Sequence, residues 1–237
     1  MSFSETEIRK LTAKRFIVEN NGADTATVQT LFQEAIKYCA SSNISEITLL
    51  VSSKTGFSST VVGEVLGETK SKALMKGGSV NIESGISLNL EIPKNFSPAK
   101  NYGLVVGLYL PKKDLATLDS IRSAEAIAFL PWIEDEGKIW MATWSPLVWG
   151  KSSWIVNPVS LSAPVEKELN TLTAMINLGT GLAHPSDKNR ATDSLKNVKA
   201  LGSNVTSTEI EQWAVKNGWA PRQAETLAKL AYKMLGR

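Results

Sequence analysis

The chain has 237 residues, of which 43% are apolar, so it can bury a sizeable core in one large domain or two small ones. It has one cysteine, Cys39, which excludes an intrachain disulfide and favours a reducing compartment. No apolar run approaches the ~18 residues of a membrane span, and the amino terminus lacks a basic-then-apolar signal, so we expect a cytoplasmic protein without a membrane partner.

The first part of the chain alternates between helical and strand patterns. Residues 3–13 predict a short helix and residues 14–19 a strand. Asp24 or Thr25 is expected to cap a second helix, whose apolar residues recur at helical spacing, namely Val28, Leu31, Phe32, Ala35, Ile36 and Cys39. The apolar run at 46–51 is typical of a strand covered on both faces. This order opens a βαβ array.

A hydroxyl-rich turn with one glycine follows the strand at 46–51, and a helix containing Val61, Val62, Val65 and Leu66 comes next. Gly56 can adopt a positive φ, and Ser58 or Ser59 is the predicted N-cap of the helix. The Walker A spacing of glycines and lysine is absent.

This turn is the candidate ligand site, because free backbone N–H groups, hydroxyls and the Lys54 ammonium can together hold a phosphate. The candidate residues are Ser52, Ser53, Lys54, Thr55, Gly56, Ser58 and Ser59. The competing interpretation is an ordinary strand-to-helix turn whose serines only cap the helix.

The segment Ser52-Ser53-Lys54-Thr55-Gly56-Phe57-Ser58 resembles the phosphate-binding loop in the C-terminal domain of pyruvate kinase. Upstream, 15–19, 21–25 and 27–40 are similar to the first strand, turn and helix of stand-alone proteins with that fold. The resemblance covers about residues 14–67. It implies an effector-phosphate loop that is not catalytic, and it implies no kinase activity, since nothing here resembles the kinase's catalytic barrel.

The middle of the chain predicts more strands. Residues 80–92 alternate apolar and polar side chains around Ser84-Gly85, which predicts a half-exposed hairpin at one edge of the sheet. Residues 103–110 and 124–130 read as buried strands, separated by a short helix that Pro111 opens.

Two features near the end of this region carry functional alternatives. The acidic trio Glu134-Asp135-Glu136 follows a predicted strand, so its carboxylates can approach the 52–58 loop and hold Mg²⁺ there, or they form a solvated turn. Five tryptophans fall within 132–154, and they either fill a seam between two halves of the protein or form a stacking surface.

From residue 160 onward only helical patterns remain. Thr206 and Glu209 predict a capping box, and Pro221 predicts the start of the last helix. His184 is the only histidine, which excludes a metal site of several His and Cys. We expect it in a loop where Ser186 or Asp187 caps the next helix.

We therefore predict a three-layer α/β/α sandwich over residues 1–160, with a mixed, centrally parallel sheet, and an all-helical domain over 161–237. The leading hypothesis is a protein that binds a small phosphorylated ligand or nucleotide at 52–59; whether it is an enzyme, and which cofactor it uses, stays open. The alternative is a scaffolding protein that holds a protein partner, a second copy of itself or, less favoured, nucleic acid. It would use the tryptophan-rich segment and the basic C-terminal helices, because residues 188–237 carry an excess of Lys and Arg.

Overall fold

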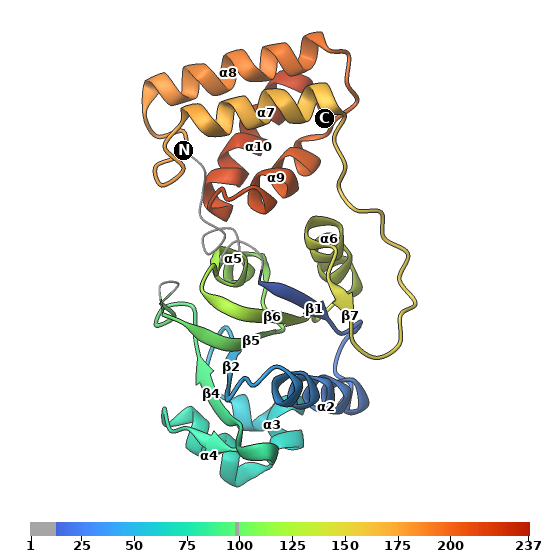
Figure 1. The fold of residues 1–237 in the computed structure, drawn as a ribbon, viewed down its shortest axis with the longest axis vertical. Coiled ribbons are helices and arrows are strands. Elements are labelled where there is room, and N and C mark those ends of the chain that lie inside the picture. Colours follow the sequence, from blue (N-terminus) through green and yellow to red (C-terminus); the bar gives the residue numbers. More distant parts are fainter. Residues whose placement is uncertain (1–12, 98–99) are drawn as a thin grey trace. The chain divides into compact units, whose positions relative to one another are not determined.

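The computed structural model describes residues 13–97 and 100–237, and the predicted helix at 3–13 lies almost wholly outside them. The chain divides into two compact units (Figure 1). The sheet unit runs to Met141 and includes Ser145–Val156, and the helical unit consists of Ala142–Trp144 and Asn157–Arg237. The sequence places the change of architecture at residue 160, and it does not assign the short piece at 142–144 to the helical part. Within the described ranges, no helix is long and apolar enough to cross a membrane.

Within the described residues, the sheet unit is built on a seven-stranded sheet in the order β3-β4-β2-β5-β6-β1-β7. The strands are β1 (Lys14–Ile17), β2 (Glu46–Leu50), β3 (Val80–Asn81), β4 (Ser87–Glu91), β5 (Tyr102–Leu108), β6 (Ala124–Leu130) and β7 (Leu147–Val148). All neighbours pair in parallel except β3 and β4, which form the antiparallel edge hairpin. The prediction of a mixed, centrally parallel sheet is confirmed.

Helices cover both faces of this sheet. The helices are α2 (Thr25–Ser41), α3 (Val61–Leu66), α4 (Glu68–Met75), α5 (Lys112–Ser120) and α6 (Glu134–Trp144). Helices α2, α3 and α4 share a core with one face, to which β5 contributes Val106 and Leu108. On the other face, Leu118 of α5 lies against Gly107, and Trp140 of α6 packs on Phe129 with ring centroids 5.4 Å apart. Two helical layers around a sheet make the predicted three-layer sandwich (Figure 1).

The N-cap of α2 and the position of its cysteine agree with the sequence pattern. Asp24 is the N-cap of α2, accepting hydrogen bonds from the backbone N–H groups of Ala26 and Thr27 at 3.2 and 3.0 Å. Cys39 is buried in the core shared with the sheet, and burial together with the negative charge of Glu125 raises the pKa of its thiol to about 12. Cys39 is therefore a protonated, enclosed core residue at neutral pH.

The helical unit consists of α7 (Ala163–Met175), α8 (Pro185–Ala200), α9 (Ser207–Lys216) and α10 (Pro221–Leu235), and this confirms the predicted helical region. The predicted capping box is present, because Thr206 and Glu209 bond each other's backbone N–H. The core of the unit includes two tryptophans. Trp219 is fully buried and its indole N–H donates to Thr173 at 2.9 Å, while the indole of Trp213 donates to Glu166 at 3.4 Å.

Candidate functional site

The sheet has a point at its carboxyl edge where two neighbouring strands send the chain in opposite directions. From β2 the chain passes through α3 and α4 on one face toward β4. From β5 it passes through α5 on the other face toward β6. In open α/β sheets, such a switch point leaves room for a ligand beyond the strand ends. The loop after β2, 51–60, and the residues after β5, 109–111, flank it.

The predicted candidate residues form one continuous loop at this edge. Ser52, Ser53, Thr55 and Ser59 are exposed, while Lys54 and Ser58 are partly buried. Gly56 has φ +74, and no atom lies within 4 Å of the position that a Cβ would take, so the glycine is needed for its backbone conformation. Phe57, which is 3% exposed, anchors the loop to the core.

The helix after the loop begins later than the sequence predicts. Residues 57–59 form a 3₁₀ turn, and the N-cap of α3 is Thr60, whose hydroxyl accepts from the backbone N–H of Gly63 at 3.1 Å. The prediction of Ser58 or Ser59 as N-cap is therefore wrong. The reason is that the left-handed Gly56 closes an extra turn before the α-helix can start.

Because Thr60 is the N-cap of α3, the hydroxyls of Ser58 and Ser59 are not used for capping. Within the described residues, Ser53 accepts from the backbone N–H of Thr55 at 3.1 Å, whereas the other side-chain hydroxyls of 52–59 make no hydrogen bond. The backbone N–H groups of Lys54, Gly56 and Ser58 also have no partner in the described part of the chain. The loop thus presents several unused donors beside one ammonium group.

Tyr109, which sequence reasoning did not single out, lies on the β5 side of the switch point. Its backbone is left-handed, with φ +52, and such a conformation in a bulky residue is strained. The phenol oxygen is buried and has no hydrogen-bond partner within the described residues. Burial and the negative charge of Asp24 raise the pKa of Tyr109 to about 12, so the phenol keeps its proton at neutral pH.

The neighbouring loops at the same edge are tied together by backbone and amide contacts. Asn20 is 4% exposed, and its side-chain NH₂ donates to the carbonyls of Gly22 and Pro131 at 2.8 and 2.7 Å. The backbone N–H of Gly22 donates to the carbonyl of Trp132 at 2.7 Å. The loops after β1 and β6 are therefore held together by hydrogen bonds. No sequence signal linked these residues, because they lie more than a hundred positions apart.

The acidic trio does not form a loop. Glu134, Asp135 and Glu136 are the first turn of α6, where carboxylates are stabilised by the helix dipole. Glu134 pairs with Lys138 at 2.5 Å, one turn along the same helix. Across residues 13–97 and 100–237, no three or more His, Cys, Asp or Glu side chains gather in a way that can hold a metal ion.

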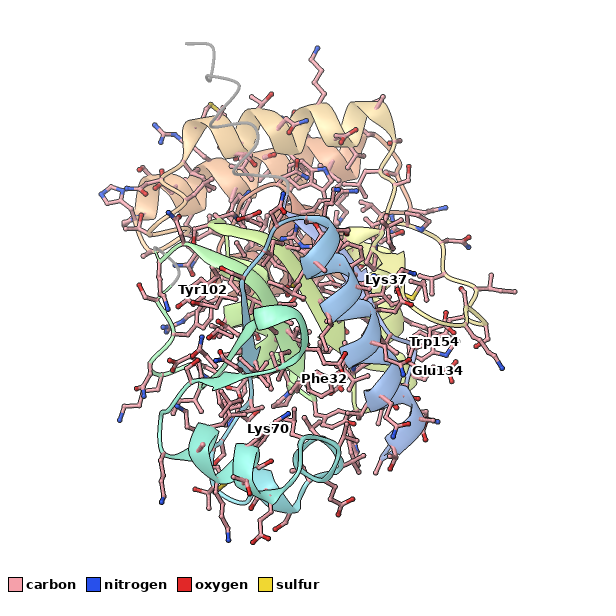
Figure 2. The ribbon with its side chains drawn as sticks, turned by 60° about the horizontal axis from the view of Figure 1, so that its bottom comes forward. Phe32, Lys37, Lys70, Tyr102, Glu134 and Trp154 are labelled. Atoms are coloured by element: carbon pink, nitrogen blue, oxygen red, sulfur yellow. The ribbon has the colours of Figure 1, made fainter. Side chains whose placement is uncertain are left out.

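The five clustered tryptophans have different surroundings. Trp149 stacks on Phe16 in the sheet unit at 4.3 Å, and Trp140 donates its indole N–H to Asp119 at 2.9 Å. Trp154, labelled in Figure 2, lies against Gly137 of α6, and Trp144 packs on the core of the helical unit. Trp132 is 46% exposed and meets Tyr109 edge-on. The described indoles therefore share no single stacking face.

His184 is itself the N-cap of α8. Its Nδ1 accepts from the backbone N–H of Ser186 at 3.3 Å and lies 2.7 Å from the Ser186 hydroxyl. The prediction that Ser186 or Asp187 caps the helix is wrong, because Pro185 fits the first helical position and starts the helix immediately after His184.

The architecture is thus that of an α/β unit with a mixed, centrally parallel sheet, followed by a helical unit, with an exposed hydroxyl-rich loop at the switch point of the sheet. A family model described as "Domain of unknown function (DUF1889)" matches residues 161–236, which lie in the helical unit. Comparisons with curated proteins and with solved structures gave no match. The matching description names no activity.

Proposed function

We propose that the protein binds a small phosphorylated ligand or nucleotide at the 52–59 loop, in a regulatory role. One observation carries the proposal: the loop lies at the switch point between β2 and β5 while its hydroxyl and backbone donors are not used for capping.

The chemistry of the loop suits an anion with several oxygen atoms. Unpartnered backbone N–H groups flank the left-handed Gly56, and a turn of this kind can form a nest of donors that favours a phosphate. The hydroxyls of Thr55 and Ser58 add donors, and the Lys54 ammonium adds a positive charge. The resemblance of residues 52–58 to the effector-phosphate loop of pyruvate kinase points to the same ligand class.

A thermal-shift screen of the full chain tests the proposal, with phosphorylated metabolites and nucleotides added with and without Mg²⁺. A true ligand at ~100 times its dissociation constant should stabilise the folded protein by about 2.7 kcal/mol. The Thr55→Val variant should lose this shift, because it removes one loop hydroxyl and adds a methyl group at an exposed position.

Thr69→Val is the matched control. Thr69 is an exposed residue of α4 in the same unit, and the change is chemically identical. We expect this variant to keep both the melting temperature and the ligand response. A response that survives in Thr55→Val, or the absence of any response in the unmodified protein, would show that the loop is only a structural connection.

A further inference from the structure

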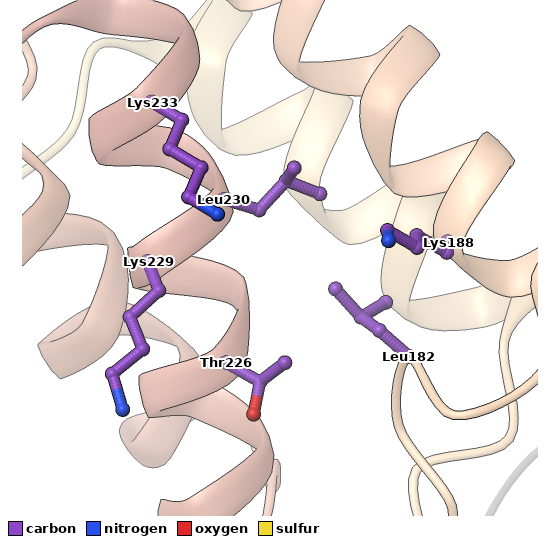
Figure 3. A pocket seen from close by; sticks show the side chains of 6 residues that line it. All are labelled: Leu182, Lys188, Thr226, Lys229, Leu230 and Lys233. Atoms are coloured by element: carbon purple, nitrogen blue, oxygen red, sulfur yellow. The ribbon is translucent and has the colours of Figure 1, made fainter.

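A second site lies in the helical unit, away from the loop discussed above. A pocket of about 300 Å³ opens between α10, the first turn of α8 and the turn that precedes α8 (Figure 3). Its lining residues are Leu182, Lys188, Thr226, Lys229, Leu230 and Lys233.

The register of α10 creates this lining. The buried face of the helix repeats at Ala224, Leu227, Ala228 and Ala231, with spacings of three and four residues. The pocket residues of α10 repeat with the same spacing, displaced by two positions, so they form a second face of the helix. Leu182 and Lys188 approach this face from the side of α8, as Figure 3 shows. The pocket is therefore made by two elements that the core of the unit already holds together.

The charged side chains among the described lining residues are all lysines. Lys229 forms an exposed ion pair with Glu225 at 2.7 Å on its own helix. The ammonium groups of Lys188 and Lys233 have no ion pair or hydrogen bond within the part of the chain that the structure describes. Like charges gathered at a concave surface repel one another and raise the local concentration of anions.

The apolar part of the lining favours an anion that carries a hydrocarbon group. Leu182 is 8% exposed and Leu230 is partly buried, so the pocket has hydrocarbon surface beside its ammonium groups. The Thr226 hydroxyl donates to the carbonyl of Arg222 at 2.9 Å, which leaves its oxygen as an acceptor only. A volume of about 300 Å³ is at the small end of known ligand pockets.

We propose that this pocket binds a small organic phosphate: a phosphate monoester held by Lys188 and Lys233, with its hydrocarbon part on Leu182 and Leu230. Ammonium groups on flexible stems act as point charges for phosphate, and the two leucines favour the ester over the inorganic ion. The proposal is independent of the 52–59 loop, because the two sites lie in different units.

Calorimetric titration of the full chain with phenyl phosphate tests it, with inorganic phosphate and phenol as comparison probes. We expect phenyl phosphate to bind more tightly than inorganic phosphate, and phenol not to bind. The double variant Lys188→Gln/Lys233→Gln should weaken phenyl phosphate binding at least tenfold. Leu230→Ala should weaken phenyl phosphate several-fold while leaving inorganic phosphate unchanged.

Two control variants distinguish binding in this pocket from a general effect of charge and from binding at the loop. Lys167→Gln removes one positive charge from an exposed position of α7, outside the pocket, and should leave binding unchanged. Thr55→Val alters the loop of the sheet unit, so a loss of binding in this variant reports phenyl phosphate that binds at the loop instead of in the pocket. Circular dichroism of the double variant checks that it is folded, which we expect because Lys188 and Lys233 are exposed.

Four results would overturn the proposal. The first is the absence of saturable phenyl phosphate binding, and the second is equal loss in Lys167→Gln and in the double variant, which indicates a diffuse charge effect. The third is loss in Thr55→Val but not in the lysine variant, which assigns the binding to the loop and supports that function alone. The fourth is displacement of bound phenyl phosphate by a single-stranded oligonucleotide that is present at a lower concentration than phenyl phosphate. That result would identify nucleic acid as the ligand.

Discussion

The two units of this protein gather their polar groups in different ways. In the sheet unit, parallel strands all end at one edge, so loops from distant parts of the chain meet there, as Asn20 and Pro131 do. In the helical unit, contacts run between helices such as α9 and α10, which are adjacent in sequence, and the lysines of α10 gather along the side of the helix. A parallel sheet therefore concentrates functional groups at strand ends, whereas a helix bundle presents them along helix faces.

The largest effects should come from opening a cavity in one core at a time. Trp219→Ala removes a fully buried indole from the helical unit and should cost about 3–5 kcal/mol of unfolding free energy. Leu49→Ala removes a fully buried side chain from β2 and should cost about 2–5 kcal/mol. Urea unfolding followed by circular dichroism measures both losses.

If the two units unfold separately, each variant should lower the urea midpoint of the unit that contains the substitution and leave the midpoint of the other unit unchanged. The separate clusters of buried residues in the two units support this expectation. A single transition that both variants shift equally would mean that the two cores unfold as one, and the contrast between the units would then not extend to their stability.

A smaller loss of unfolding free energy than in the two core variants is expected from a substitution beneath the 52–59 loop. Gly63 lies in α3, where an added Cβ would run into the carbonyl oxygen of Phe57 and the backbone of Ser58. Gly63→Ala should therefore cost about 1–3 kcal/mol and displace the loop, so the ligand response proposed for 52–59 should be lost.

Gly56→Ala is the informative companion, because its Cβ meets no atom within 4 Å and only the left-handed backbone is strained. That strain is about 1–2 kcal/mol. Melting temperatures of both variants, with and without the ligand found in the screen, check the prediction. A Gly63→Ala variant that is as stable and as responsive as the unmodified chain would show that the loop and α3 are not packed as described.

The smallest effect should come from one carboxylate at the sheet edge. Glu19 accepts hydrogen bonds from the backbone N–H groups of Ser153 and Trp154 at 2.6 and 3.1 Å. Burial alone would raise the pKa of Glu19, but the hydrogen bonds from Ser153, Trp154 and Ser152 outweigh it and hold the pKa below its usual value.

A lowered pKa means that this stabilisation is present above the pKa of the unfolded chain and is lost as the pH falls through the folded value. Glu19→Gln should thus be less stable than the unmodified protein at pH 7 by at most about 1 kcal/mol, because the group is solvent-accessible. The deficit should shrink as the pH falls below the ordinary carboxyl pKa of 4.5 toward the lower folded pKa. Urea midpoints measured from pH 7 downward test this, and a deficit that does not change with pH would contradict the role of the charge.

Much of the fold follows from local pattern. The spacing of Val28, Leu31 and Phe32 predicts α2, and the apolar runs of β2, β5 and β6 predict buried strands, because periodicity reports which side chains meet the core. The candidate loop was also found from its hydroxyls and its glycine. The start of α3 was misplaced, since the left-handed Gly56 closes an extra turn at 57–59 before the α-helix begins.

The sequence by itself determined most of the strands, the described helices other than α4 and α6, and the chemical character of the 52–59 loop, since these depend on neighbours along the chain. Only the tertiary structure decided that β1 lies between β6 and β7, that Tyr109 adopts a strained backbone beside the switch point, and that three lysines surround one pocket. The physical reason is that strand pairing and side-chain convergence join residues far apart in sequence, and no local pattern records which distant partner each element meets.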